Sequence, residues 1–329
     1  MTISPTQRGS IEMAVAAFIG KRLVVSAALL LVISFLVFSL LSVTPGSAIA
    51  VLVGSRPSTP ELIAALEARH HLNDPFLVQY WHWLVDALQL DFGTSTRSGA
   101  PVTGIITDHL PVSIQLAVYT LVLVVGIGVP CGMLAAYQRD RWVDRGISMA
   151  SVIGMSAPGF AVGMLLIFVF GLALGLLPVY GVGNGFLDRL VHLTLPATAL
   201  SIALIALLIR QTRAGALNVL RQDYMTFAKA RALDPSRVFF RYALRNSAMP
   251  VVTAAGLILI AALSGAVLVE TVFSVPGVGS LMVQSVTEKD LPVVQGLAVC
   301  LGAFVIVVNL TVDVVALLVD PRMRYAGKG

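Results

Sequence analysis

The residues best suited to chemistry in this sequence lie in one basic stretch, residues 223–250, which reads DYMTFAKARALDPSRVFFRYALRNSAMP. Arg237, Arg241 and Arg245 are four residues apart, so on a helix they share one face. A row of guanidinium groups binds anions, either the headgroups of acidic lipids or an acidic protein surface. The stretch therefore predicts a binding surface.

The pattern within this stretch predicts two short helices. Alternating alanines at 228–232 favour a first helix. Asp234 and Pro235 end it and start a second, because Asp is a good N-cap and Pro suits a first turn. Three interpretations stay open: an amphipathic helix held by lipid headgroups, an arginine face bound to an acidic protein, and a rigid helix–turn–helix that docks into a soluble motor.

Motifs of catalysis and of cofactor binding are missing from the sequence. None of the four lysines belongs to a phosphate-binding GxxxxGK[ST] loop, and neither HExxH nor GxSxG occurs. The two cysteines lie in apolar runs without ligand spacing, which is typical of small buried residues. The histidines of residues 43–113 lack a carboxylate triad. We therefore expect a chain that is not an enzyme and that has no catalytic residue, metal or cofactor.

The composition is that of a membrane protein. Apolar residues make up 57% of the chain and charged residues 12%, about half the charged share of a soluble domain. Six apolar runs have the length of a membrane-spanning helix, and they are too long and too uniformly apolar for barrel strands. The six runs are Leu23–Leu41, Ile114–Ala136, Ile147–Leu177, Leu193–Ile209, Val251–Val275 and Val293–Val319. The sequence thus predicts an all-α polytopic protein with six transmembrane helices, the first of which is retained and not cleaved as a signal peptide.

The distribution of Lys and Arg predicts the topology, because these residues concentrate on the cytoplasmic side. Seventeen of the 22 fall in the two termini and two loops: Arg8, Lys21, Arg22, Arg139, Arg141, Arg145, Arg210, Arg213, Arg221, Lys229, Arg231, Arg237, Arg241, Arg245, Arg322, Arg324 and Lys328. Both termini are then cytoplasmic, and the net charge of +5 needs no nucleic-acid partner.

This topology divides the chain into three parts. The cytoplasmic N-terminus is 1–22, the transmembrane domain is 23–319, and the cytoplasmic tail is 320–329. Within the domain, 43–113 is a large outer loop and 210–249 is the cytoplasmic loop that carries the two short helices between spans four and five. The outer loop is expected to contain a helix near 57–72 and an amphipathic helix in 76–93.

Glycine and proline refine the expected packing of the spans. The third run is too long for one straight crossing and contains Pro158, so we expect a kinked or tilted helix. Gly128 and Gly132 form one GxxxG pair, which lets helices approach closely, either within this chain or against a second membrane subunit. Glu270 and Asp313 are the two carboxylates well inside the apolar runs. Carriers driven by protons or sodium usually keep such groups in the middle of the membrane. With so few of them here, we expect the energy for any transport to come from elsewhere than this chain.

Several stretches together resemble the permease subunits of binding-protein-dependent ABC importers, in particular their oligopeptide/dipeptide/nickel branch. RQDYMTFAKARAL and RYALRNSAMPVVT resemble the cytoplasmic EAA loop of that family. VLVETVFSVPGVGSLMVQSVTEKDLPVVQG resembles the end of span five and its outer loop, and NLTVDVVALLVDPRMR resembles the C-terminal signature. TPGSA and the segment from DPFLVQYW to TDHLP fit as well, so the resemblance covers nearly the whole chain.

The resemblance assigns an ATPase-coupling role to the cytoplasmic loop. It implies contacts with an ATPase subunit through Tyr224, Phe227, Ala228, Lys229, Ala230, Arg231, Ala232, Leu233, Asp234, Arg237, Arg241 and Arg245. The family usually has glycine where this chain has Ala232, so the turn here depends more on Asp234 and Pro235.

The resemblance also implies an assembly and a cargo. A second homologous permease, usually a different chain, would complete the pore in the cell inner (cytoplasmic) membrane. Two cytoplasmic ATPases would carry ATP and Mg, and an extracytoplasmic binding protein would deliver dipeptides or oligopeptides. Nickel chelates or glutathione-like peptides are the alternative cargo of the same assembly. An autonomous secondary carrier, whose basic loop binds only membrane lipid, is the more distant alternative.

Overall fold

The computed structural model describes residues 5–43, 53, 59–69, 73–222, 225, 227 and 248–319. These residues are helical apart from turns, short connecting segments and an isolated bridge between Thr94 and Pro101. The helices are α1 (Pro5–Val43), α3 (Pro60–Arg69), α4 (Phe76–Leu88), α5 (Val102–Tyr137), α6 (Trp142–Ser156), α7 (Gly159–Leu166), the π-helix η1 (Ile167–Ala173), α8 (Phe186–Leu220), α11 (Ala248–Val272), α12 (Val278–Thr287) and α13 (Leu291–Val319). The part of the chain that the structure describes is thus all-α, as predicted.

Among the described residues, five helices are long and apolar enough to cross a membrane, or up to six if a bent pair is counted as one span. The five segments are Ile19–Leu40, Val102–Tyr137, Phe186–Leu220, Val251–Val272 and Leu291–Val315, and each overlaps one of the predicted apolar runs. The helices extend beyond the runs: α5 begins at Val102, well before the apolar run that starts at Ile114. The two expected helices of 43–113 are present as α3 and α4.

The third apolar run is broken more sharply than the predicted kink. Helix α6 ends at Ser156, and α7 with η1 continues at an angle of 99° to it. Ala157, between them, is extended with ψ of 119°. Proline explains this, because Pro158 has no N–H to donate and disfavours helical backbone in the residue before it. The sequence located the distortion but not its size.

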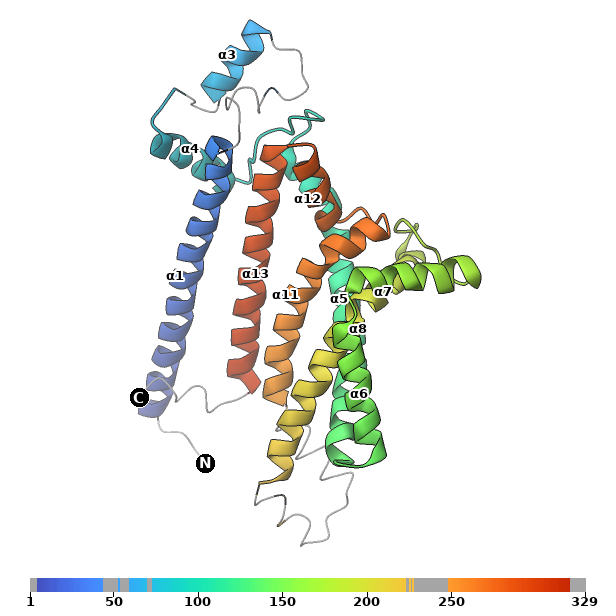
Figure 1. The fold of residues 1–329 in the computed structure, drawn as a ribbon. Helices are drawn as coiled ribbons and strands as arrows, with labels where there is room; N and C mark the ends of the chain where they lie inside the picture. The colour runs from blue at the N-terminus through green and yellow to red at the C-terminus, as the bar shows by residue number, and fades with distance from the viewer. Residues whose placement is uncertain are drawn as a thin grey trace. The chain divides into compact units, whose positions relative to one another are not determined.

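The helices fall into two compact units. Unit 1 comprises Met1–Ala14, Ile114–Val275 and Val308–Gly329, and unit 2 comprises Val15–Ser113 and Pro276–Val307. In unit 1 helix α8 packs against α6, α7 and α11, as Figure 1 shows. Leu208 of α8, Val124 of α5 and Ile258 of α11 belong to one buried apolar cluster.

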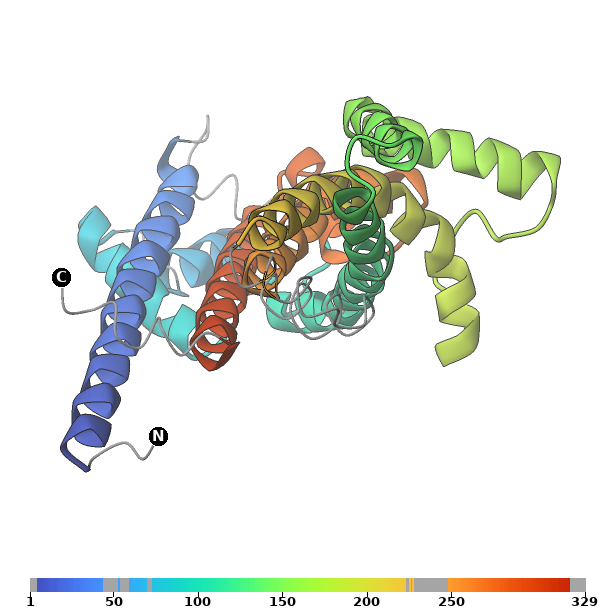
Figure 2. The same cartoon turned by 90° about the horizontal axis from the view of Figure 1, so that it is seen from below.

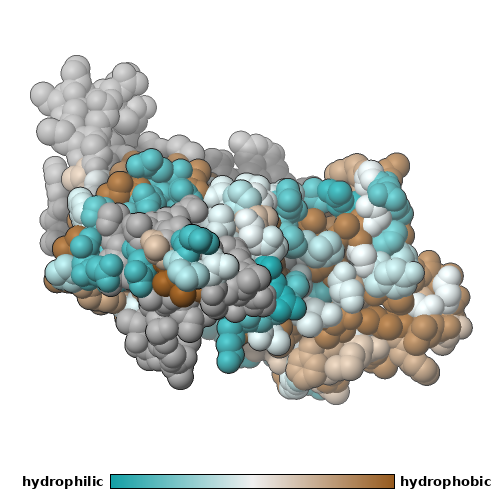
Figure 3. Space-filling model, turned by 90° about the horizontal axis from the view of Figure 1, so that it is seen from above, coloured by the Kyte–Doolittle hydropathy of each residue, from teal (hydrophilic) through white to brown (hydrophobic). Residues whose placement is uncertain are grey.

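The segment formed by α7 and η1 carries apolar side chains on its surface. Phe168 and Leu172 are 62% and 70% exposed. Figure 3 shows hydrophobic surface, in brown, on the side where this segment lies. The backbone after η1 folds back, and the N–H groups of Leu176 and Leu177 donate to the carbonyl of Phe170. Exposed apolar side chains of this density are expected in a chain that lies in a membrane.

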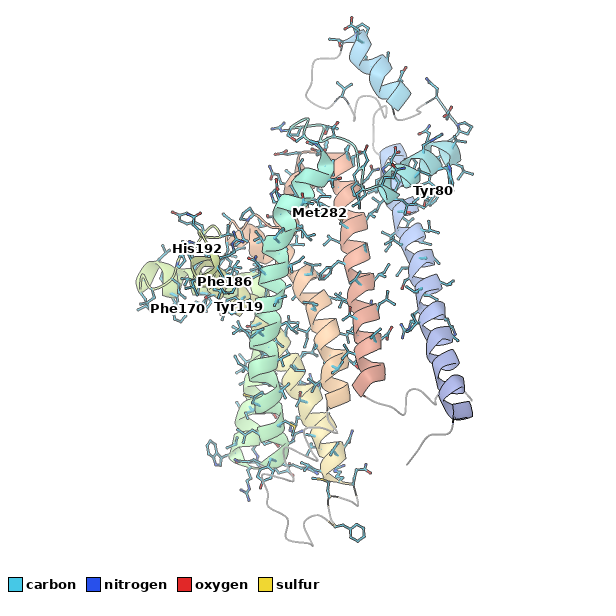
Figure 4. The ribbon with its side chains drawn as sticks, turned by 180° about the vertical axis from the view of Figure 1, so that it is seen from behind. Tyr80, Tyr119, Phe170, Phe186, His192 and Met282 are labelled. Atoms are coloured by element: carbon cyan, nitrogen blue, oxygen red, sulfur yellow. The ribbon has the colours of Figure 1, made fainter. Side chains whose placement is uncertain are left out.

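In unit 2 an aromatic cluster fastens α4 to α1. Phe35 and Phe38 of α1 contact Phe76 and Tyr80 of α4, with ring centroids 5.2 to 5.9 Å apart. The Tyr80 hydroxyl also lies 2.8 Å from Ser34 Oγ. Figure 4 shows Tyr80 where the two helices meet. The predicted amphipathic helix of 76–93 thus packs on a span.

A second contact in unit 2 fixes the turn before α5. The Ser95 hydroxyl donates to Asp290, and the Thr96 N–H donates to the same carboxylate over 3.1 Å. Asp290 is buried and precedes α13, where its carbonyl accepts from the Val294 N–H. Arg97 pairs with Glu288 at 3.5 Å on the surface. We call Ser95, Thr96 and Asp290 the Asp290 clasp.

Candidate functional site

The predicted ATPase-coupling loop lies mostly outside the described residues. This applies to Tyr224, Ala228, Lys229, Ala230, Arg231, Ala232, Leu233, Asp234, Arg237, Arg241 and Arg245. Phe227 is described, and its side chain is 69% exposed. The structure therefore characterises the base of the loop, where it leaves α8 at Leu220.

Met225, two residues before Phe227, is fully buried. It packs with Met133 and Ala136 of α5 and with Ala216 of α8. Its N–H donates to the Gln222 carbonyl over 2.9 Å, which closes a turn directly after α8. The loop therefore starts from an anchored residue, while the neighbouring aromatic side chain is exposed and available for contact.

An ion pair with a buried carboxylate joins α6 to α8 near the same place. Arg213 Nε donates to Asp144 Oδ1 over 2.6 Å, and the terminal nitrogen donates to Oδ2 over 2.7 Å. The side chain of Asp144 is 4% exposed and that of Arg213 is 29% exposed. Two parallel bonds between a guanidinium and a carboxylate fix both distance and orientation. Figure 2 shows α5, α6 and α8 as neighbouring helices when the molecule is seen from below.

Asp144 also holds the turn that connects α5 to α6. The Asp140 N–H donates to Asp144 Oδ2 over 2.9 Å, and the Arg141 N–H donates to the Gln138 carbonyl over 3.0 Å. Asp140 has φ of +64°, a left-handed conformation that Asp tolerates better than most residues. One carboxylate thus binds both the turn and the arginine of α8.

Helices α5 and α8 approach closely along two glycines. A Cβ at position 132 would lie 2.7 Å from Thr212 Cβ and 2.8 Å from the main-chain oxygen of Ile209. A Cβ at position 128 would lie 3.0 Å from Leu208 Cβ. The GxxxG pair of the second span therefore packs inside this chain, the first of the two uses that such a motif can have.

Together these contacts define the α5–α6–α8 junction: Gly132, Met133, Asp144, Arg213 and Met225. The site is suited to force transmission, because the base of the loop is tied to α5 by packing and to α6 by an oriented ion pair. In the sequence, Gly132 stands out only as part of a GxxxG pair. Arg213 counts only as one of the basic residues that predict the topology, and nothing singles out Met133 or Met225. The partner of Arg213 is 69 residues away. The one further signal is Asp144, a carboxylate placed among Arg139, Arg141 and Arg145.

The two carboxylates inside the apolar runs differ in exposure. Glu270 of α11 is fully buried, with 0% of its surface exposed, and its carbonyl accepts from the Val275 N–H at the end of the helix. Asp313 of α13 is half-buried. Ser156 and Ser264 donate their hydroxyls to carbonyls of their own helices, so neither serine needs another partner.

The described residues form helices with five to six candidate membrane spans among them, which is the fold of an integral membrane protein. The family model described as "Binding-protein-dependent transport system inner membrane component" matches residues 128–325, and the model of the corresponding N-terminal part matches residues 15–117. The chain belongs to this family of transport-system membrane components.

Individual relatives extend over almost the whole chain. The oligopeptide transport system permease protein AppB of Bacillus subtilis is 37% identical over 316 residues, which covers 94% of this chain and all of that protein (100%). The glutathione transport system permease protein GsiC of Escherichia coli is 36% identical over 308 residues, covering 94% of this chain and 99% of that protein.

A solved structure shares the fold. A chain of the MetNI methionine ABC transporter, in an inward-facing conformation, superimposes with a TM-score of 0.53 at 15% identity. The match covers 66% of this chain and 96% of that chain. At this identity the likeness concerns the fold alone.

Proposed function

We propose that this chain is a membrane-spanning permease subunit of an ATP-driven importer that takes up dipeptides or oligopeptides. The observation that carries the proposal is the similarity to AppB along almost the full length of both chains. Absence of the motifs of catalysis from the sequence agrees with a transport subunit that leaves hydrolysis to other chains.

The proposed assembly has two permeases, two ATPases and a binding protein. This chain pairs with a second, homologous permease, as a heterodimer. The cytoplasmic ATPases hold ATP and Mg, and an extracytoplasmic protein delivers the peptide. The chain crosses the inner (cytoplasmic) membrane six times with both termini inside, if α6 with α7 and η1 counts as one span. The excess of Lys and Arg in the termini and in the loops at 137–146 and 210–249 supports this orientation.

In the proposed mechanism the loop at 210–249 couples the ATPases to the spans. Closure of the ATPases on ATP draws the loop toward its counterpart in the second permease, and hydrolysis releases it. A loop that moves between two positions couples distant sites only if its attachment to the spans is firm. Burial of Met225 beside exposed Phe227 supports such an attachment.

Glutathione is a second candidate cargo of the same assembly. The similarity to GsiC is nearly as high as that to AppB, 36% against 37%. Glutathione is itself a small peptide-like molecule, so the same type of path would serve both. Comparison of the uptake of glutathione with that of alanine peptides separates the two.

The test of the assembly is purification of this chain, tagged at its native locus, in mild detergent, followed by mass spectrometry. We expect a second membrane protein of the same family and one or two chains with a GxxxxGK[ST] loop in stoichiometric amounts. Recovery of this chain alone, from membranes in which such ATPases survive extraction, would contradict the proposal and favour an autonomous carrier whose basic loop binds lipid.

A further inference from the structure

We propose that the Asp144–Arg213 ion pair is a positioning element that makes α6 move together with the ATPase-coupling loop. This inference rests on the proposed function, because it concerns how movement of the loop reaches the rest of the permease. In this role Asp144 and Arg213 touch neither ATP nor peptide. They keep the start of α6 in register with the last turns of α8.

Arg213 is placed where movement of the loop first arrives. It lies near the end of α8, which ends at Leu220. Met225 packs back onto Met133 of α5 and Ala216 of α8. The last turns of α8 and the start of the loop therefore form one packed block. A displacement of the loop is passed first to this block.

Helix α6 is attached to that block by the ion pair. Farther from the loop, α6 meets α8 at ordinary packing distances, since a Cβ at Gly154 would lie 3.4 Å from Ile202 and 3.5 Å from Ala206. At the end near the loop, the bidentate pair at 2.6 and 2.7 Å joins the two helices. Apolar packing is non-directional and lets helices slide, whereas a guanidinium–carboxylate fork fixes orientation.

Helix α6 in turn carries other elements of unit 1 with it. Through Asp144 the pair also binds the Asp140 N–H, so the turn from α5 follows Arg213. At its other end α6 leads into α7, where a Cβ at Gly163 would lie 2.9 Å from the ring of Phe273 at the end of α11. Movement of α6 is thus transmitted to α7 and, through Phe273, to the end of α11 within unit 1.

An alternative role is purely structural, and the two roles predict different behaviour. Replacing both members of a buried ion pair by apolar side chains of similar size is often neutral or stabilising. In the double variant Asp144→Leu with Arg213→Met the Asp140 N–H also loses its acceptor, but Asp140 is exposed and water can take its place, so the variant should fold and assemble under either role. A positioning role requires orientation, which the apolar pair lacks, and it also requires the fork, which Arg213→Lys removes while keeping the charge.

The experiment measures ATP hydrolysed per molecule transported. The complete complex, purified through this chain, is placed in proteoliposomes with its binding protein and supplied with radiolabelled trialanine or glutathione, whichever the wild type takes up. The matched control is Arg210→Lys, on the same helix, whose exposed arginine contacts α6 through a weak thioether acceptor, Met155 Sδ, at 3.5 Å. We expect the double apolar variant to assemble normally and to consume about fivefold more ATP per molecule or worse. Arg213→Lys should lie between it and the wild type, and Arg210→Lys should match the wild type.

Each outcome decides one question. An unchanged ratio of ATP to cargo in the double apolar variant, in fully assembled complex, would overturn the positioning role and leave the pair structural. An equal rise in Arg210→Lys would overturn it as well, because the effect would then be unspecific. If the wild-type complex takes up trialanine and glutathione without any dependence on ATP, the proposed function itself fails and the inference with it.

Discussion

The α5–α6–α8 junction and the Asp290 clasp both depend on a buried aspartate, but the two carboxylates have different partners. Asp144 faces a guanidinium from another long helix, with two bonds of 2.6 and 2.7 Å. Asp290 accepts from the Ser95 hydroxyl and from the main-chain N–H of Thr96. The first carboxylate joins two helices through a full charge and also holds the turn at Asp140, whereas the second is held by neutral donors from a turn.

This difference indicates what each region can do. A pair of full charges resists relative rotation of the helices that carry it, which suits a part that must move as one body. Neutral donors from a turn hold the local backbone but leave helices free to shift, which suits a part that presents a surface. The junction is therefore the region to which we assign the positioning role, and the clasp holds the turn before α5.

The largest effect is expected from Gly132→Leu in the junction. The new side chain would meet the main-chain oxygen of Ile209, whose distance to a Cβ at this position is already 2.8 Å. Overpacking against backbone cannot be relieved by a rotamer change, so we expect a loss of about 3 kcal/mol or more. Thermal unfolding of the purified chain measures it. Gly126→Leu is the matched control, since a Cβ there has nothing within 4 Å. Equal melting temperatures for the two variants would show that the α5–α8 contact is not tight.

A smaller effect is expected from Asp290→Ala in the clasp. The Ser95 hydroxyl and the Thr96 N–H, both of buried residues, would lose their acceptor, at a cost of about 2 kcal/mol. The turn should then open locally while the spans stay intact. Cleavage by trypsin after Arg97, whose side chain is 60% exposed, should accelerate by about tenfold or more. An unchanged cleavage rate would mean that the clasp does not hold the turn.

Tyr80→Phe should have a modest effect, because it removes one hydroxyl and keeps the ring. The bond to Ser34 is 2.8 Å long, and its loss is expected to cost about 1 kcal/mol. Amide hydrogen exchange in α4 should then become about fivefold faster. Trp81→Phe, at a side chain that is 62% exposed, is the control and should leave exchange unchanged. Faster exchange in the control alone would show that Trp81, and not Tyr80, lies on the face of α4 that packs against α1.

The smallest effect is expected from Glu288→Gln, beside the clasp. Its ion pair with Arg97 is 3.5 Å long, and the arginine is mostly exposed, so solvent screening leaves it roughly 0.5 kcal/mol or less. Trypsin cleavage after Arg97 should stay within about twofold of the wild type. An acceleration as large as that of Asp290→Ala would show that the surface pair, and not the buried aspartate, holds the turn.

The sequence predicted the helical class and the approximate positions of the five candidate spans because apolar runs of this length permit few other structures. It also located the distortion at Pro158, but the 99° bend depends on packing of α7 against α8 and α11. Asp144 and Arg213 are 69 residues apart, so their pairing follows from the tertiary fold and not from a local pattern. Met225 lies inside the predicted coupling segment, and its burial depends on the ends of α5 and α8. Eleven of the twelve predicted coupling residues lie outside the described residues, so their contacts with an ATPase stay a prediction.

The decisive measurement for an ATP-driven importer is uptake of radiolabelled trialanine and glutathione by proteoliposomes that contain the complex purified through this chain. ATP is supplied on the side of the ATPases and binding protein on the other side. We predict that at least one of the two probes is taken up when ATP and the binding protein are both present. Uptake should be lost when either is left out, and also when the ATPase chains are omitted. Uptake that follows a proton or sodium gradient without ATP would contradict this function, and so would uptake by this chain alone.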